Sequence, residues 1–327
     1  MQLFIYEPAY RRLQGQIHAI CPQVRPILMM PDSRILQDGK ELSPEDVRPD
    51  VAWISTDVFF SPAARDFLLQ MIKGPPVKWL QSAAAGFDNP IFQTLAKKAG
   101  IYTNSNGAAK GIAEFVFANV IDFFHPNAAR RTLQAAHEWK RLAFRDIAQS
   151  NWLIIGYGNI GQEVGKRAMA FEANVTGVRR NPAGAGPAPA NAMLRPQDVL
   201  AALPRMDVVV LTADSNESNR HMVNAPFLAS MKPGSVLVNI ARGALIDEAA
   251  LLDSLSRGLP ECAILDVFET EPLPADSPFW DHPRVRLTAH CAAASPMMEP
   301  RGDAVFLRNL AHFTAHEPLE LRVTINL

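Results

Sequence analysis

Cysteine is scarce in this chain, and the few cysteines form no pattern. Cys21, Cys262 and Cys291 are widely separated and show neither the spacing of a disulfide framework nor that of zinc ligands. Disulfides do not persist in reducing compartments. The scarcity therefore predicts a cytoplasmic protein, and no metal site is expected.

A charge excess of either sign is also missing. The 32 lysines and arginines balance 33 aspartates and glutamates, giving a formal net charge of -1. A general binder of nucleic acid or of membrane surfaces needs a basic excess, so neither partner is expected. The start, MQLFIYEPAYRRLQ, lacks the pattern of a signal peptide. No apolar run reaches the roughly 18 residues of a membrane span. These absences leave a small molecule as the expected partner.

Apolar residues, by contrast, make up 48% of the 327 residues, enough for two buried cores. Short runs of Val, Ile and Leu alternate with helical patterns, which is typical of parallel sheets covered by helices. The pattern predicts strands within 3–6, 51–56, 77–82, 101–105, 151–158, 174–180, 207–213, 234–243, 262–268 and 285–290. It predicts helices at 62–74, at 90–100 (ended by Gly100), over 111–141 with a break at Pro126, and at 306–317, with a loop over 181–196.

A glycine motif lies between one predicted strand and a helix. In LIIGYGNIGQEVG, Gly156, Gly158 and Gly161 have the G-x-G-x-x-G spacing, with Asn159 and Ile160 between the last two. These glycines permit a tight turn, close approach of a pyrophosphate and packing of the helix on the strand. The helix N-terminus then offers its N–H groups to the phosphates. The motif predicts a dinucleotide-binding domain.

The next predicted strand ends on Arg179 and Arg180, where a carboxylate would hydrogen-bond the adenosine ribose of NAD(H). No Asp or Glu occurs between Asn174 and Asn191. Guanidinium groups form forked, charge-assisted hydrogen bonds to phosphate oxygens. We therefore expect NADP(H), with its 2′-phosphate, in preference to NAD(H). The alternative is that the arginines are a solvated strand end on which adenine stacks.

Three further residues follow strands of the same series: Arg242, Glu271 and His290. Ligands of open α/β sheets gather where the strands end. Reduction of a keto group needs a proton donor at the developing alkoxide, and histidine titrates in the useful range. A carboxylate orients the ring, and an arginine holds a substrate carboxylate and polarises the carbonyl. The set predicts hydride transfer to a 2-keto acid.

The sequence resembles the D-isomer-specific 2-hydroxyacid dehydrogenase family. The resemblance rests on the glycine motif, on NIARG at 239–243, on LDVFETEP at 265–272 and on the strand-end histidine. It implies that His290 is the acid/base, Glu271 its partner and Arg242 the substrate-binding arginine. It also implies cofactor contacts at Ala241 and at Asp266, the latter with the nicotinamide carboxamide. The turn QSAAAGFDN matches the family's carboxylate-binding turn, with Ala85 and Gly86 as the substrate-binding positions.

The family's architecture implies two doubly wound α/β domains with parallel sheets. A Rossmann cofactor domain, 104–292, is inserted into a flavodoxin-like substrate domain formed by 1–103 and 293–327. The long helical segment implies a homodimer, with Trp139 in the interface. The alternative is that Trp139 packs on its own subunit.

The chain departs from the family at three places near the predicted site. Ala289 and Asp214 stand where proline is usual, and small alanines replace the glycine that normally follows the histidine. The favoured function is NADPH-dependent reduction of a small 2-keto acid, of the glyoxylate or hydroxypyruvate type, to the D-2-hydroxy acid. Two alternatives stay open: a dinucleotide-sensing binding protein of the corepressor kind, and a phosphite-type dehydrogenase on the same fold.

Overall fold

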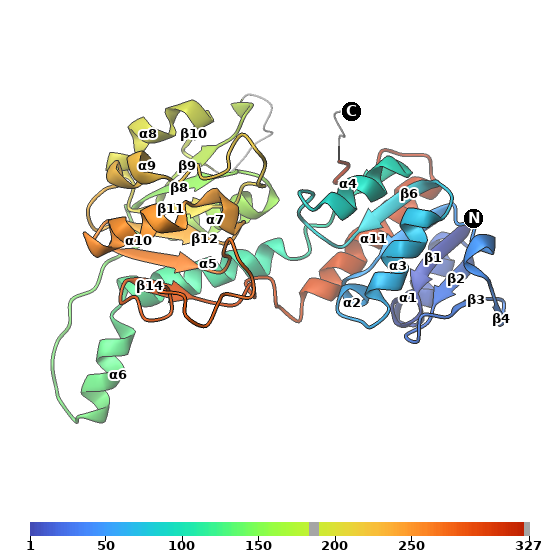
Figure 1. The fold of residues 1–327 in the computed structure, drawn as a ribbon, viewed down its shortest axis with the longest axis horizontal. Helices are drawn as coiled ribbons and strands as arrows, with labels where there is room; N and C mark the ends of the chain where they lie inside the picture. The colour runs from blue at the N-terminus through green and yellow to red at the C-terminus, as the bar shows by residue number, and fades with distance from the viewer. Residues whose placement is uncertain (183–189, 324–327) are drawn as a thin grey trace. The chain divides into compact units, whose positions relative to one another are not determined.

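The computed structural model describes residues 1–182 and 190–323, and the chain forms two compact units (Figure 1). The first unit joins Met1–Ala108 to Ser295–Leu327, and the second is Ala109–Ala294. Each contains a seven-stranded sheet. Within the described residues, no helix has the length and apolar character needed to cross a membrane. The predicted α/β class with two parallel-sheet domains is confirmed.

The sheet of the first unit has the strand order β4-β3-β2-β1-β5-β6-β7. Its five parallel strands, β2-β1-β5-β6-β7, follow the flavodoxin-like order 2-1-3-4-5. The strands are β1 (Gln2–Tyr6), β2 (Arg25–Met29), β3 (Ile35–Gln37), β4 (Lys40–Glu41), β5 (Val51–Ile54), β6 (Val77–Ser82) and β7 (Ala99–Thr103). Gly100 lies inside β7, so the predicted helix 90–100 is too long: the helix ends at Lys97 because the chain must turn into the sheet.

Helices cover both faces of this sheet. They are α1 (Glu7–Ile20), α2 (Thr56–Phe59), α3 (Ala64–Lys73), α4 (Pro90–Lys97) and α11 (Met298–Thr314). Trp53 of β5 stacks on Phe306 of α11 with ring centroids 4.1 Å apart. Phe4 of β1 stacks on Phe67 of α3 at 4.4 Å. Because Phe4 pairs with Ala52 and not with Trp53, these two aromatic contacts lie on opposite faces of the sheet.

All strands of the second sheet are parallel, in the order β10-β9-β8-β11-β12-β13-β14. Counted from β8, this is the Rossmann order 3-2-1-4-5-6 with one added strand. The strands are β8 (Asn151–Ile155), β9 (Asn174–Val178), β10 (Ala192–Leu194), β11 (Val208–Leu211), β12 (Val236–Asn239), β13 (Cys262–Leu265) and β14 (Val285–Leu287). The predicted loop 181–196 was partly wrong, since β10 lies within it and pairs with β9. Residues 183–189 of that loop lie outside the described residues.

The second unit also has helices on both faces of its sheet. They are α5 (Ala109–Phe124), α6 (Asn127–Ala135), α7 (Asn159–Ala170), α8 (Val199–Ala202), α9 (Ala225–Ala229) and α10 (Glu248–Ser256). Phe117 of α5 stacks on Trp152 of β8 at 5.0 Å. Leu153 and Ile155, on the other face of β8, belong to the core that includes Phe227 of α9.

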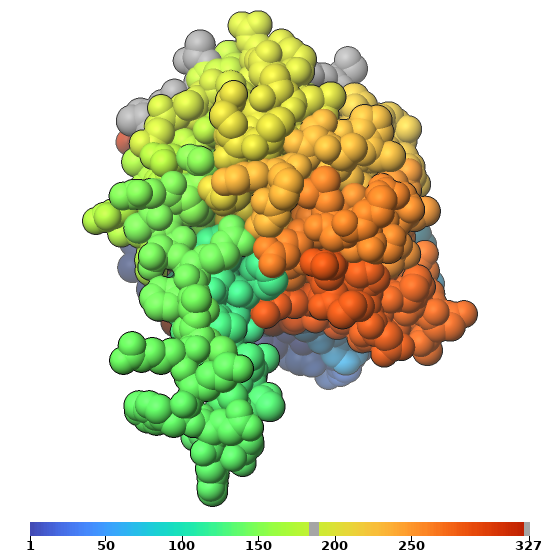
Figure 2. Space-filling view, turned by 90° about the vertical axis from the view of Figure 1, so that its left-hand side faces the viewer, coloured from blue at the N-terminus to red at the C-terminus, as the bar shows by residue number. Residues whose placement is uncertain are grey.

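A segment that we call the arm, residues 125–144, projects from the second unit and contains α6 (Figure 2). The predicted helix over 111–141 is too long: α5 ends at Phe124, and 136–149 is not helical. The base of the arm is closed by Arg145 N, which donates to the carbonyl of Phe124 at 3.0 Å. The side chain of Trp139 is fully exposed. None of the α6 residues is buried, so packing against a neighbouring element does not stabilise a longer helix here.

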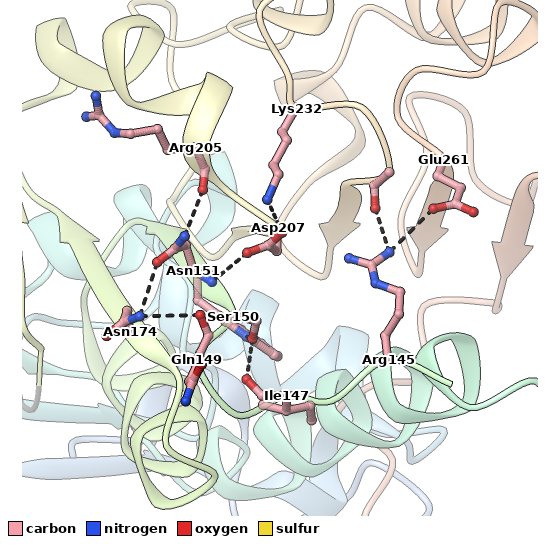
Figure 3. Close-up of polar contacts among 12 residues, drawn as sticks. Arg145, Ile147, Gln149, Ser150, Asn151, Asn174, Arg205, Asp207, Lys232 and Glu261 are labelled. Atoms are coloured by element: carbon pink, nitrogen blue, oxygen red, sulfur yellow. Dashed lines mark hydrogen bonds and ion pairs between the residues drawn. The ribbon is translucent and has the colours of Figure 1, made fainter. Parts of the chain in front are cut away.

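Polar contacts connect the amino ends of the strands in the second unit (Figure 3). Asp207, directly before β11, accepts hydrogen bonds from Asn151 N at 2.8 Å and from Lys232 Nζ at 2.7 Å. Arg145 forms an ion pair with Glu261 at 3.4 Å, directly before β13. The segment between the arm and β8 is thereby anchored to this side of the sheet.

Candidate active site

The glycine loop lies at the carboxyl end of β8 and leads into α7. Gly156 has φ +97°, and a Cβ there would lie 2.4 Å from the backbone nitrogen of Ala213, so only glycine fits. Beside Gly158, by contrast, the nearest atom to an added Cβ would be 4.0 Å away. The loop is therefore open beside Gly158, and Asn159 and Ile160 begin α7, whose first N–H groups lie at this turn.

Arg179 follows β9 and contacts the glycine loop, because β9 pairs with β8. Its Nε donates to the carbonyl oxygen of Tyr157, and its guanidinium carbon lies 6.0 Å from the centre of the Tyr157 ring. Burial raises the pKa of Tyr157 to about 12, against the opposing effect of the arginine charge. Arg180 is exposed. Sequence reasoning missed Tyr157, since the position between two motif glycines carries no distinctive signal.

Thr212 is a second residue that sequence reasoning missed at this loop. It follows β11, and its Oγ1 donates to the carbonyl of Gly156 at 2.7 Å. An added Cβ at Gly161 would lie 2.7 Å from the same carbonyl and 3.0 Å from Thr212 Oγ1. The loop is therefore held between two strand ends and the start of α7.

His290 and Glu271 form a direct pair in the second unit. Nδ1 of His290 lies 2.7 Å from Oε2 of Glu271. The other carboxylate oxygen, Oε1, accepts a hydrogen bond from Phe268 N at 2.9 Å, so the glutamate is fixed at both oxygens. With Nδ1 engaged by Glu271, Nε2 is the nitrogen left to face a substrate. The structure thus brings together two residues that lie on separate loops of the sequence.

Asp266 is 1% exposed, and its carboxylate points toward the segment around His290. Its Oδ1 accepts from Thr288 Oγ1 at 2.6 Å and from Cys291 N at 2.8 Å, and its Oδ2 accepts from Ala292 N at 2.9 Å. The predicted contact between Asp266 and a nicotinamide carboxamide stays a prediction: three donors of the protein bind the carboxylate, and Oδ2 accepts one of them.

Arg242 lies in the turn after β12, next to Ala241. Asn239 holds this turn: its Nδ2 donates to the Arg242 carbonyl at 2.9 Å, and its Oδ1 accepts from Ala241 N at 3.0 Å. A Cβ added at Gly243 would lie only 1.9 Å from the carbonyl carbon of Phe268. The turn of Arg242 therefore packs directly against the loop that leads to Glu271.

An ionic cluster lies where the turn of Arg242 packs against the loop before Glu271, and the sequence did not predict it. Glu269 lies 2.5 Å from Nε2 of His221 and 3.0 Å from Arg220, and its backbone nitrogen donates to Glu248 at 2.8 Å. Burial raises the pKa of Glu248, and the charge of Glu269 adds to that increase. The cluster joins the helix after Arg242 to the loop before Glu271.

A cavity of about 430 Å³ lies beside His290 and Glu271 within the second unit. Its wall is mainly apolar and includes Phe268, Trp280 and Leu287. Among the described residues, no group of three or more His, Cys, Asp or Glu is placed to hold a metal ion.

The predicted substrate-binding turn lies in the first unit, after β6. Ala85 is exposed and Gly86 is half-buried. Asn104 Nδ2 donates to the carbonyl of Ala85 at 3.0 Å, and Ser82 Oγ accepts from Ala84 N at 3.1 Å. Side chains thus fix both sides of this turn at the carboxyl side of its sheet.

The Rossmann sheet, the glycine loop and the paired His290 and Glu271 define a dinucleotide-dependent oxidoreductase. Residues 117–292 match the family model described as D-isomer specific 2-hydroxyacid dehydrogenase, NAD binding domain. The chain belongs to the D-isomer specific 2-hydroxyacid dehydrogenase family. The predicted family, enzyme class and nicotinamide dinucleotide cofactor are therefore confirmed.

The chain is similar to several reductases of this family. It is 32% identical to glyoxylate/hydroxypyruvate reductase A of Serratia proteamaculans over 187 residues, which cover 57% of this chain and 59% of that protein. It is 33% identical to hydroxypyruvate reductase of Thermotoga maritima over 203 residues, 61% of this chain and 64% of that one. These alignments span less than two thirds of either relative.

Among solved structures, the chain resembles an NADPH-dependent glyoxylate/hydroxypyruvate reductase of Sinorhizobium meliloti in complex with NADP and sulfate. The TM-score is 0.75 at 23% identity, with 98% of both chains covered. At this identity the likeness establishes the shared fold.

Proposed function

We propose that the protein catalyses the NADPH-dependent reduction of a small 2-keto acid, of the glyoxylate or hydroxypyruvate type, to the D-2-hydroxy acid. The observation that carries this proposal is the pair of His290 and Glu271, 2.7 Å apart, in the same unit as the glycine loop. The names of the similar reductases support the substrate class.

In this reaction His290 is the proton donor. The dinucleotide, when bound, supplies the hydride to the carbonyl carbon. As negative charge develops on the carbonyl oxygen, the imidazolium gives its proton from Nε2. Glu271 orients the ring through Nδ1 and stabilises its positive charge. The two hydrogen bonds of Glu271 fix that orientation before substrate binds.

Substrate binding is assigned to two groups. Arg242 binds the substrate carboxylate and polarises the carbonyl oxygen. A guanidinium can donate to two oxygens at once, so one arginine serves both purposes. In the first unit, the backbone N–H groups of Ala85 and Gly86 bind the carboxylate of the 2-keto acid. These small residues leave the backbone accessible, which supports the assignment. The first unit, 1–103 with 293–327, is accordingly proposed as the substrate domain and 104–292 as the cofactor domain.

The cofactor is proposed to be NADP(H). Its pyrophosphate binds at Gly156, Gly158 and the start of α7, where the open side of Gly158 leaves room for it. Arg179 and Arg180 bind the 2′-phosphate. The contact of Arg179 with the Tyr157 carbonyl supports this, because it holds the guanidinium beside the loop while leaving other N–H groups to donate. Ala241 lines the cofactor site from the turn before Arg242.

We further propose a cytoplasmic homodimer. The three cysteines are all free, which suits a reducing compartment. The arm carries Trp139 fully exposed and Phe144 51% exposed. Large apolar side chains on a projecting segment are typical of an association surface. A second copy of this chain is the proposed partner.

The test is the initial rate of glyoxylate and hydroxypyruvate reduction with NADPH and with NADH. For the wild type we expect a strong preference for NADPH. In Arg179→Asp, the ratio of kcat/KM for NADPH to that for NADH should fall about 10- to 100-fold, the equivalent of one charge-assisted hydrogen bond. Arg179→Gln, which keeps an N–H donor for the Tyr157 carbonyl, separates loss of charge from disruption of the loop.

Arg180→Asp makes the same charge change at the exposed neighbour, which is proposed to bind the same phosphate. A smaller change in the ratio is expected for it. Equal turnover of both cofactors by the wild type would contradict the assignment of the arginines. Failure to reduce any acid in a panel of 2-keto acids, with phosphite oxidation tested in parallel, would contradict the substrate class.

A further inference from the structure

We infer that Glu269 is a positioning residue that fixes the loop carrying Glu271. It does so by binding two side chains of another loop, Arg220 and His221. The inference rests on the proposed function, in which Glu271 orients the ring of His290 for proton donation. Glu269 thus acts on the reaction through Glu271.

Glu269 lies where the loops after three strands meet. β11, β12 and β13 are adjacent and parallel, so the chain leaves all three at the same edge of the sheet. His221 follows β11, Glu248 follows β12, and Glu269 follows β13. The third of these loops continues to Glu271, two residues beyond Glu269.

Backbone hydrogen bonds join the first two loops directly. His221 N donates to the carbonyl of Ala244 at 2.8 Å, and Val223 N donates to the carbonyl of Leu245 at 3.0 Å. Val223 and Ile246 also pair as an isolated parallel bridge. The loops after β11 and β12 therefore form a common support.

The third loop is attached to this support through Glu269. Oε1 of Glu269 lies 2.5 Å from Nε2 of His221 and 3.0 Å from Nη2 of Arg220. The backbone nitrogen of Glu269 donates to Oε1 of Glu248 at 2.8 Å. The side chain and the backbone of one residue thus bind the loops after β11 and β12.

The attachment reaches Glu271 over a short path. Phe268, directly before Glu269, donates its N–H to Oε1 of Glu271 at 2.9 Å. The other oxygen of Glu271 lies 2.7 Å from Nδ1 of His290. The backbone at Phe268 and Glu269 also packs so closely on Gly243 that a side chain there would collide with it. A shift at Glu269 therefore moves the N–H group that fixes the Glu271 carboxylate.

Charge explains why the cluster contains two basic side chains. Burial raises the pKa of Glu248, the negative charge of Glu269 adds to that increase, and His221 opposes it. Two carboxylates this close repel, and Arg220 and His221 offset the repulsion. The Glu269 side chain is still 29% exposed, so solvent screens these ion pairs and their loss should change stability little. The expected consequence of their loss is a displaced loop in a folded protein.

The first measurement is kcat of Glu269→Ala at saturating NADPH and hydroxypyruvate. A displacement of about 1 Å at a reacting group can lower turnover about 100-fold, and the N–H of Phe268 still binds Glu271 in this variant, so we expect kcat to fall about 10-fold. The thermal unfolding midpoint should stay near the wild-type value. Asp253→Ala, which removes an exposed carboxylate of α10, is the control and should retain kcat.

His221→Asn tests the same contact from the other loop. Asparagine tolerates the φ of +51° at this position, and its shorter side chain loses the contact with Glu269. Since Arg220 remains, kcat should fall in the same direction by less. This variant also serves if Glu269→Ala does not fold.

A double-mutant cycle with Glu271→Ala separates positioning from a general structural role. If Glu269 acts by placing the Glu271 carboxylate, its removal should not lower kcat further once that carboxylate is gone. An effect of about 10-fold in one background and none in the other is a coupling of about 1.4 kcal/mol. An equal loss in both backgrounds would overturn the inference, and so would unchanged kcat in Glu269→Ala.

Amide hydrogen exchange over 266–272 measures the loop without turnover. Faster exchange at Phe268 is expected in Glu269→Ala and in His221→Asn, because its N–H group stays bound to Glu271 only while the loop is fixed. Unchanged exchange there would also overturn the inference. Failure of the proposed function looks different, since the wild type would then reduce no 2-keto acid. In that case the exchange result still decides whether Glu269 fixes the loop.

Discussion

At the amino side of the sheet in the second unit, polar side chains bind one another (Figure 3). Asp207 joins Asn151 to Lys232, and Arg145 pairs with Glu261. At the carboxyl ends of the same strands, polar side chains are bound by the protein through some of their atoms and exposed through others. His290 is the clearest example: Glu271 engages its Nδ1, and its side chain is 53% exposed.

The amino side and the carboxyl side belong to the same strands, so comparing them separates residues that stabilise the fold from residues that carry the proposed reaction. Contacts at the amino side hold the chain together, and their loss should lower the free energy of unfolding with little effect on turnover. Residues at the carboxyl side carry the proposed reaction, and their loss should lower turnover with little effect on the free energy of unfolding. Both expectations follow from the general rule that ligands of parallel sheets bind where the strands end.

The largest effect is expected for His290→Gln. Gln keeps a polar group of similar reach and cannot donate a proton to an alkoxide, so kcat should fall about 1000-fold, within the range known for general acids. The Kd for NADPH and the thermal unfolding midpoint should stay near the wild-type values. Steady-state kinetics with hydroxypyruvate and calorimetry are the measurements. Retention of more than a tenth of kcat would exclude His290 as the proton donor.

The reverse pattern is expected for Asp207→Ala at the amino side. The substitution removes the acceptor for Asn151 N and the partner of Lys232, which costs about 2 kcal/mol for a partly buried charged acceptor. The unfolding midpoint should fall by about 5 °C, with kcat at 25 °C unchanged. Asp253→Ala is the control, since that carboxylate is 64% exposed. Loss of kcat without loss of stability would contradict the separation of the two sides.

A smaller, pH-dependent effect is expected for Glu248→Gln. The pKa of Glu248 is raised in the folded protein, so stability is lost as the pH rises from 4.5 through that raised pKa. Gln cannot ionise, and its carbonyl can still accept the hydrogen bond of Glu269 N. The variant should therefore unfold at a higher temperature than the wild type at pH 7, and at the same temperature at pH 4. A constant difference across this range would show that ionisation of Glu248 is not the cause.

The central strands were predictable because they are buried on both faces. Runs such as VVVL at 208–211 and CAIL at 262–265 consist almost entirely of apolar residues, and polar gaps separate them. The hairpin of β3 and β4 was missed, although its two-residue loop is Asp38-Gly39, with φ +51° and +77°. That pair is a strong signal for a tight hairpin turn, and the shortness of both strands concealed it.

The sequence by itself predicted the alternation of buried strands and helices, the glycine loop and the proposed proton donor with its partner. These follow from local patterns: apolar runs, glycine spacing and residue types after strands. Only the tertiary structure decided which groups contact Asp266, where the arm leaves the unit and how Arg179 reaches the glycine loop. Each of these depends on which strands lie side by side, because hydrogen bonds such as those from Cys291 and Ala292 to Asp266 join residues about 25 positions apart.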